Sequence, residues 1–139
     1  MARAGRAARL TPRRLVLDSG AVIALGRGEM RARAFVARAR ELMVPVEVPV
    51  VVVAETIRGG PRDAPVQRVL AAIGSIPVAH ERHGRTAGRL LGAARPSSTI
   101  DALVVAHAVE AGGAHVLTGD RQDLERLAAP HPEVLVQPL

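Results

Sequence analysis

The sequence contains no cysteine, no lysine, no tryptophan and no tyrosine. Without cysteine there is no disulfide, no thiolate zinc site and no cysteine nucleophile. This agrees with a reducing compartment, and we expect a cytoplasmic protein. Without lysine, a Walker-type phosphate loop and a Schiff-base enzyme would each lack a needed group. The single aromatic residue other than histidine is Phe35, so the chain has no aromatic platform on which nucleic-acid bases could stack.

Long apolar runs are also missing, since none approaches the roughly 20 residues of a membrane span. Nearly half of the 139 residues are nevertheless apolar, which is enough for one folded domain with a real core. The formal charge is +6, and all 19 basic residues are arginine. A coding bias explains most of the lysine loss. Arginine binds phosphate as a planar bidentate donor, so the charge supports a polyanionic ligand without proving one.

The first 14 residues hold five arginines and no acid. This composition is typical of a transit peptide or of an arm that binds nucleic acid, but it lacks the apolar core of a secretory signal. We interpret residues 1–14 as a flexible basic extension and residues 15–139 as the folded domain.

Short apolar runs alternate with amphipathic segments along the rest of the chain. Such alternation is typical of an α/β fold with a parallel sheet that is covered on both faces. Strands are predicted at residues 15–17, 44–48, 76–79, 114–118 and 134–136. Helices are predicted at residues 21–25, 29–43, 49–58, 64–73, 81–94 and 121–128, and another is capped within 97–99 and runs to 111.

The valine run from Val50 to Val53 can be read in two ways. Its residue type favours a strand. Pro49 before it and Gly59-Gly60-Pro61 after it favour a helix from 49 to 58, which we prefer. That helix would place Glu55 on the same face as Val51 and Arg58.

Two further local features predict contacts. Asp63 stands where it could cap the helix at 64–73. Gly84, Gly88 and Gly92 recur every four residues, a spacing that could form a face for close packing, although glycine there weakens the helix.

Four acids, Asp18, Glu55, Asp101 and Asp120, each lie beside an apolar run, where an isolated charge is costly. Such a carboxylate takes up a proton or finds a cation. In open α/β sheets ligands bind outside the carboxyl ends of the strands, and these positions are compatible with one pocket there. An oxygen-only site suits Mg²⁺ or Mn²⁺, which can activate a water and orient a phosphodiester.

At these positions the chain resembles the PIN-domain ribonucleases, especially toxins of the VapC type. The resemblance lies in LVLDSGAVIAL (15–25), VAE (53–55), TIDA (99–102) and LTGD (117–120), in that order. It implies a three-layer α/β/α sandwich with a central parallel sheet, and hydrolysis of RNA that depends on Mg²⁺ or Mn²⁺. It also implies a homodimer and a small inhibitory antitoxin of the VapB type. The extension before residue 15 departs from the family pattern.

Carried over by position, Asp18, Glu55, Asp101 and Asp120 match the acidic metal-binding quartet of the family, and Asp123 matches a fifth acid that some members have. Ser19 and Thr118 match hydroxyl positions that support the site.

Each acid also has a simpler explanation. Asp18 could serve simply as the cap of a helix, and Asp101 could serve simply to stabilise a helix dipole. Glu55 could pair with Arg58 at the surface. We expect one of Asp120 and Asp123 to cap the helix at 121–128, and we prefer Asp120 for the metal.

Other polar residues are weaker candidates. Arg58, Arg95 and Arg121 lie near the acids in sequence and could contact RNA phosphates, although surface solvation explains any one of them. His107 is expected to be a satisfied core histidine. His80 and His83 have helical spacing but no evident third ligand.

Two other functions remain open. The chain could be an inactive RNA-binding or dimerisation module that kept the fold, although unused clustered carboxylates would destabilise it. It could also be a phosphatase with Asp18 as nucleophile. Phosphatases of the haloacid dehalogenase type usually carry a second Asp at the position of Gly20 and a lysine, and both are missing here.

Overall fold

A computed structural model describes residues 13–139 of the chain. A four-stranded sheet, in which every neighbouring pair is parallel, forms its centre with the order β2-β1-β3-β4. The strands are β1 (Leu15–Leu17), β2 (Val46–Glu47), β3 (Ala114–Thr118) and β4 (Val134–Pro138). Residues 1–12, and with them most of the predicted basic extension, lie outside the described residues.

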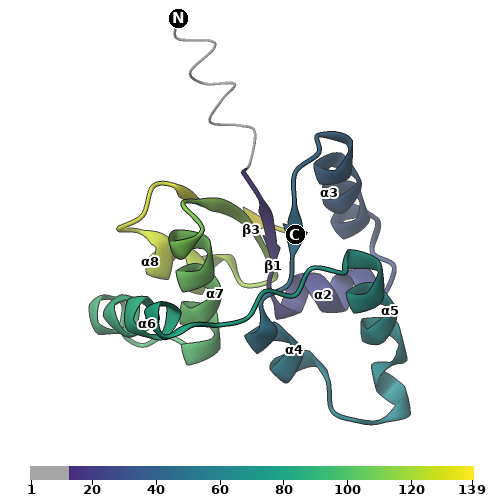
Figure 1. Ribbon diagram of the computed structural model, residues 1–139, viewed down its shortest axis with the longest axis horizontal. Helices are drawn as coiled ribbons and strands as arrows, with labels where there is room; N and C mark the ends of the chain where they lie inside the picture. Colours follow the sequence, from purple (N-terminus) through teal and green to yellow (C-terminus); the bar gives the residue numbers. More distant parts are fainter. Residues whose placement is uncertain (1–12) are drawn as a thin grey trace, which may run out of the picture.

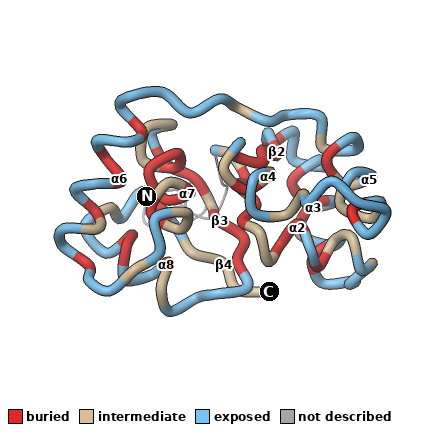
Figure 2. Tube along the Cα trace, turned by 90° about the horizontal axis from the view of Figure 1, so that it is seen from below, coloured by how far each residue is buried: buried red, intermediate tan, exposed pale blue. Residues whose placement is uncertain are grey.

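Helices cover both faces of the sheet. They are α2 (Ser19–Gly26), α3 (Met30–Glu41), α4 (Val50–Thr56), α5 (Ala64–Ile73), α6 (Glu81–Ala93), α7 (Thr99–Glu110) and α8 (Arg121–Ala128), with a 3-10 turn η1 (Pro61–Asp63). Helices α2, α3 and α5 lie on one side of the sheet, and α6, α7 and α8 lie on the other (Figures 1 and 2). The predicted α/β/α sandwich is therefore confirmed.

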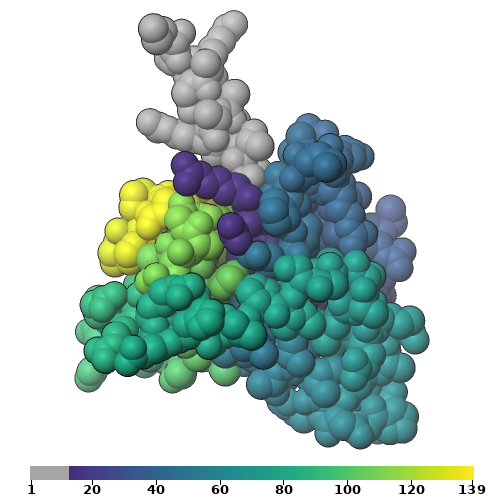
Figure 3. Space-filling view, viewed as in Figure 1, coloured from purple at the N-terminus to yellow at the C-terminus, as the bar shows by residue number. Residues whose placement is uncertain are grey.

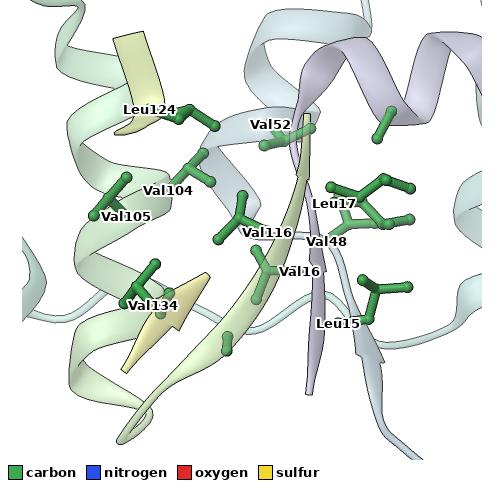
Figure 4. Packing of buried hydrophobic residues seen from close by; sticks show 14 of the residues in the cluster. Leu15, Val16, Leu17, Val48, Val52, Val104, Val105, Val116, Leu124 and Val134 are labelled. Atoms are coloured by element: carbon green, nitrogen blue, oxygen red, sulfur yellow. The ribbon is translucent and has the colours of Figure 1, made fainter. Parts of the chain in front are cut away.

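The core consists of short aliphatic strands buried between the two helical layers. All three residues of β1 are buried, as a central parallel strand requires. Successive side chains of a strand point to opposite faces, and accordingly Leu15 and Leu17 lie on one side of β1 while Val16 points towards α7 (Figure 4). Helix α7 faces the sheet with Val104 and Val105 (Figure 4). The core therefore seats α7, which carries one of the four acids, directly on the sheet.

The valine run forms helix α4, as predicted, and not a strand. Pro49 occupies the position before the first helical residue, and Val52 is completely buried. The helix ends at Thr56, two residues earlier than predicted. The prolines on both sides of Val46–Val48 limit β2 to two residues, so that the strand predicted at 44–48 is also shorter.

The predicted strand at residues 76–79 is absent from the described structure. This segment lies beside the end of β2, where Ser75 accepts a hydrogen bond from the Val48 amide (3.0 Å) and Pro77 accepts one from the Val50 amide (3.3 Å). Pro77 has no amide hydrogen to donate in return, so the ladder does not continue. The chain instead runs across the face of the molecule towards α6 (Figures 1 and 3).

The predicted capping by Asp63 is wrong as well. Asp63 stands at the cap position of α5, but its side chain makes no capping hydrogen bond there. Its carboxylate instead accepts hydrogen bonds from the amides of Arg58 (2.9 Å) and Gly59 (2.6 Å). These bonds lower the pKa of Asp63 and close the loop that follows α4.

The glycines of α6 form no packing face. A methyl group built on Gly84, Gly88 or Gly92 would meet no atom of the described structure within 4 Å. Glycine in a helix is disfavoured because it has the most backbone entropy to lose on folding.

We predict that Gly84→Ala, Gly88→Ala and Gly92→Ala each raise the free energy of unfolding by about 0.5–1 kcal/mol. Denaturation by urea would measure this gain. Gly113→Ala is the contrasting control, because Gly113 has φ +116° and its added methyl would lie 2.8 Å from the Glu133 carbonyl oxygen. That variant should lose stability by about 1–3 kcal/mol. Destabilisation by the alanines in α6 would show that another surface covers this helix.

Candidate functional site

The four acids of interest come from four separate segments that meet at the carboxyl edge of the sheet. Asp18 directly follows β1, and Asp120 comes two residues after β3. Asp101 lies in the first turn of α7, and Glu55 lies in the last turn of α4. Since β1 and β3 are neighbouring parallel strands, the loops that follow them leave the sheet side by side.

Asp18 is the most buried of these acids, with 5% of its surface exposed. Its Oδ1 accepts a hydrogen bond from the Ala21 amide at 2.8 Å, so the residue caps α2 as its simplest explanation required. Its Oδ2 accepts a hydrogen bond from the Thr118 hydroxyl. Burial raises the pKa of Asp18, whereas these bonds and one from the Gly119 amide act in the opposite direction.

Thr118 connects the two loops. Its hydroxyl donates to Asp18 and accepts a hydrogen bond from the Asp120 amide at 2.8 Å. The side chain is 1% exposed, so it holds both aspartates in a fixed relation. Ser19, the other hydroxyl predicted to support the site, is half-buried and makes no side-chain hydrogen bond with another described residue.

Asp101, Asp120 and Asp123 each place one carboxylate oxygen within 4.8 Å of the others. Asp120 caps α8, since its Oδ1 accepts a long bond of 3.4 Å from the Asp123 amide. The Asp123 carboxylate accepts a hydrogen bond from the Arg126 guanidinium at 2.9 Å. The predicted cap at α8 is therefore Asp120, and both acids face Asp101.

Asp101 responds to all of these charges. Burial raises its pKa, and the charges of Asp18, Asp120, Glu55 and Asp123 raise it further, to about 6. Four carboxylates from three other segments thus act on one side chain. Glu55, although exposed, is among the charges that raise the pKa values of both Asp18 and Asp101, so its side chain lies on the same side of the molecule.

This donor set fits a hard divalent cation. All the candidate ligands are carboxylate oxygens, the type that Mg²⁺ and Mn²⁺ prefer. The two oxygens of Asp18 have four lone pairs together and receive the three hydrogen bonds described above, so one lone pair remains for a ligand. Clustered carboxylates that repel each other are stabilised by a bound cation.

The predicted phosphate-binding arginines differ in their surroundings. Arg58 donates hydrogen bonds to the carbonyl oxygens of Ala54 and Ile57, and it does not form an ion pair with Glu55. Arg121 pairs with Glu125 at 2.7 Å. Arg95 is exposed and forms no ion pair with another described residue.

Arg126 is the arginine that directly contacts a site acid, and the sequence reasoning missed it. It pairs with Asp123 and also donates to the Pro96 carbonyl oxygen at 2.9 Å. The spacing of three residues between Asp123 and Arg126 on a helix is a signal that could have identified this pair.

A second charged group, centred on Glu47, lies away from these acids and was also missed. Glu47 in β2 accepts hydrogen bonds from Arg14 (2.9 Å) and His107 (3.0 Å). Burial would raise the pKa of Glu47, but these bonds lower it overall. His107 is thus the satisfied core histidine that was expected, and it stacks on His83. A glutamate between two buried valines was the available signal.

The fold is shared with bacterial toxin–antitoxin structures. VapBC2 from Rickettsia felis bound to a promoter DNA fragment aligns with a TM-score of 0.70 and 13% identity, over 90% of this chain and 98% of that one. A toxin–antitoxin complex from Klebsiella pneumoniae gives a TM-score of 0.66 and 19% identity, over 87% and 95%. FitAcB from Neisseria gonorrhoeae gives a TM-score of 0.63 and 17% identity, over 88% of this chain and 95% of that one. At these identities the likeness concerns the fold.

A search of curated proteins finds no significant match to this chain. The sequence profile described as the PIN domain, however, matches residues 15–130, most of the chain. This match agrees with the parallel sheet and with the acids at its carboxyl edge. The chain therefore belongs to the PIN-domain family.

Proposed function

We propose that the chain is an endoribonuclease toxin of the VapC type, dependent on Mg²⁺ or Mn²⁺, that hydrolyses RNA phosphodiester bonds in the cytoplasm. Asp18, Glu55, Asp101 and Asp120 would hold the cation, with Asp123 as a further ligand. The observation that carries this proposal is the geometry of the acids: carboxylate oxygens of Asp101, Asp120 and Asp123 lie within 4.8 Å of one another, at the edge of the sheet where Asp18 follows β1.

The acids would divide the work according to their surroundings. Asp18 is fixed by Thr118 and by the start of α2, so it offers oxygens that do not move when a ligand binds. Asp101 is only half-buried and must lose its proton to act as a ligand. Glu55 and Asp120 are exposed and can adjust to the substrate. A bound divalent cation would supply an activated water and would offset charge on the phosphate.

RNA would be held through its phosphates, because the chain has no aromatic platform. Arg95 is the best placed of the predicted contacts, since it is exposed and precedes α7 by only a few residues. Arg126 becomes a further candidate because it already lies against Asp123. A phosphate could take over this guanidinium when a cation takes over the carboxylate.

An inhibitory antitoxin of the VapB type would need a surface of its own. The structure offers a groove of about 610 Å³ between α2, α3 and α5. Its apolar wall includes Val36, Val69 and Ile73, and the four arginines that line it are Arg27, Arg33, Arg40 and Arg68. We propose that an acidic amphipathic segment of the antitoxin occupies this groove, since it matches both the apolar wall and the charge. We also propose that the toxin is a homodimer.

The alternative function, an inactive module that kept the fold, would leave the clustered carboxylates without a purpose. No helix among residues 13–139 is long and apolar enough to cross a membrane.

Asp101→Asn tests the proposed metal site. The amide removes one charge from a crowded group, so we expect the metal-free protein to unfold at a higher temperature than wild type. We also expect RNA cleavage, and stabilisation by Mn²⁺, to be lost. Glu41→Gln is the matched control, because it removes one negative charge from an exposed pair with Arg38 on α3. RNA cleavage that survives Asp101→Asn, or that needs no divalent cation, would refute the mechanism.

The raised pKa of Asp101 should make both stability and Mn²⁺ affinity depend on pH. The pKa of Asp101 rises from 3.8, the ordinary value of an aspartate side chain in water, to about 6 in the folded protein, so folding favours its protonated form. Stability from this group is therefore fully present below pH 3.8 and is lost progressively as the pH rises from there through about 6. Wild type should lose stability relative to Asp101→Asn over this window. Mn²⁺ affinity should increase with pH up to about 6 and then change little. Titrations at pH 5, 6 and 7.5 would measure both trends, and a Mn²⁺ affinity that stays constant over this range would contradict the assignment.

Reversing charges in the groove tests the proposed binding site of the antitoxin. Arg33→Glu combined with Arg68→Glu should weaken binding of the antitoxin encoded by the neighbouring small gene at least tenfold, because two rim charges become repulsive. Arg38→Glu is the control, since Arg38 lies on the same helix but does not line the groove. Binding by purified proteins and rescue of growth would both be measured. Equal loss in the control would place the antitoxin elsewhere.

A further inference from the structure

Two glycines touch where the first turn of α2 meets the loop after β3. Gly20 follows Asp18 by two residues, and Gly119 directly precedes Asp120. A methyl group built on Gly20 would lie 3.0 Å from both the Cα and the amide nitrogen of Gly119. Backbone therefore lies directly against backbone, with no side chain between the first turn of α2 and the loop after β3.

The contact is tighter than an ordinary van der Waals contact. The atoms that the added methyl would meet belong to the main chain, and so they cannot swing aside as the end of a flexible side chain could. The same methyl would also lie 3.4 Å from Oδ1 of Asp18. A side chain at position 20 therefore requires the first turn of α2 and the loop after β3 to separate by a few tenths of an ångström.

The contact is asymmetric. A methyl built on Gly119 would meet the Cα of Gly20 at 3.4 Å, close to an ordinary contact distance. Gly119 is also not among the glycines with positive φ, so alanine fits its backbone conformation. Of the two glycines, only Gly20 is required by the lack of space.

The two touching segments also carry the bonds that hold the acids. Asp18 lies against the Thr118 hydroxyl and the Gly119 amide, and Thr118 in turn holds the Asp120 amide. Moving the start of α2 away from the loop after β3 would lengthen the bonds from these donors to Asp18 and would increase the distance from Asp18 to Asp120.

We infer that Gly20 is a positioning residue, which through its contact with Gly119 sets the spacing between Asp18 and Asp120 and so selects a small divalent cation over a larger one. The inference rests on the proposed function, because it assigns a size preference to the same site. Mg²⁺ has a rigid shell with oxygens at about 2.0–2.1 Å, whereas Ca²⁺ accepts flexible geometry at about 2.3–2.6 Å. A wider site should therefore harm Mg²⁺ binding more than Ca²⁺ binding.

Titration of the full chain with Mg²⁺ and with Ca²⁺, followed by calorimetry and by the unfolding temperature, tests this inference. Gly20→Ala should weaken Mg²⁺ binding at least about tenfold, as changes behind metal ligands commonly do, while Ca²⁺ binding falls by a smaller factor. Gly119→Ala is the matched control and should keep both affinities near those of wild type. Gly119→Val adds bulk from the opposite loop and should reproduce the change in preference, including where Gly20→Ala does not fold.

The outcomes separate this inference from the function on which it rests. Wild-type preference in Gly20→Ala or in Gly119→Val would overturn the spacing role and leave the proposed nuclease intact. An equal loss of both ions would overturn it too, because the contact would then support the fold without setting the size of the site. An equal loss in Gly119→Ala would show that position 20 is not special. A wild-type chain that binds neither Mg²⁺, Mn²⁺ nor Ca²⁺ would overturn the proposed function together with the inference.

Discussion

The parallel pairing of β1 with β3 is the constraint on which the candidate site depends. The register joins Leu17 to Leu117, so the next residues along the chain, Asp18 just after β1 and Thr118 at the end of β3, lie side by side. One hydrogen bond then links them, from the Thr118 hydroxyl to the Asp18 carboxylate. Helix α7 packs on the sheet through Val104 and Val105, and this packing brings Asp101 to the same edge. A shift of one residue in this register would turn Asp18 to the other face of the sheet.

Much of this arrangement could be predicted because it follows from local patterns. The apolar runs of β1 and β3 and the amphipathic helices are visible in sequence, and the order of the acidic motifs identifies the family. The position of Glu55 depends on whether the valine run is a strand or a helix. Pro49 correctly indicates a helix there, against the strand preference of the valines. The raised pKa of Asp101 agrees with the convergence that was expected, whereas the roles of the acids as ligands stay predictions.

The remaining features depend on contacts between distant residues, which a single sequence does not contain. The strand at 76–79 failed because Pro77 meets the end of β2, a pairing that only the tertiary structure creates. Asp63 stands at a suitable position for a helix cap, but its carboxylate accepts hydrogen bonds from the Arg58 and Gly59 amides in place of the helix amides. Position 20 illustrates the same limit, because a glycine two residues after Asp18 looks like an ordinary turn until Gly119 is placed against it.

The attachment of Arg14 has a mechanical consequence for the short strand β1. Arg14 is bound on two sides: its guanidinium grips Glu47 in β2, and its carbonyl oxygen accepts the His115 amide in β3 at 3.0 Å. A force applied through the residues before it would reach the sheet at this point. The force would be divided between both neighbouring strands before it reached Leu15. The three-residue strand that leads to Asp18 is thus shielded from tension on the N-terminal side of the chain.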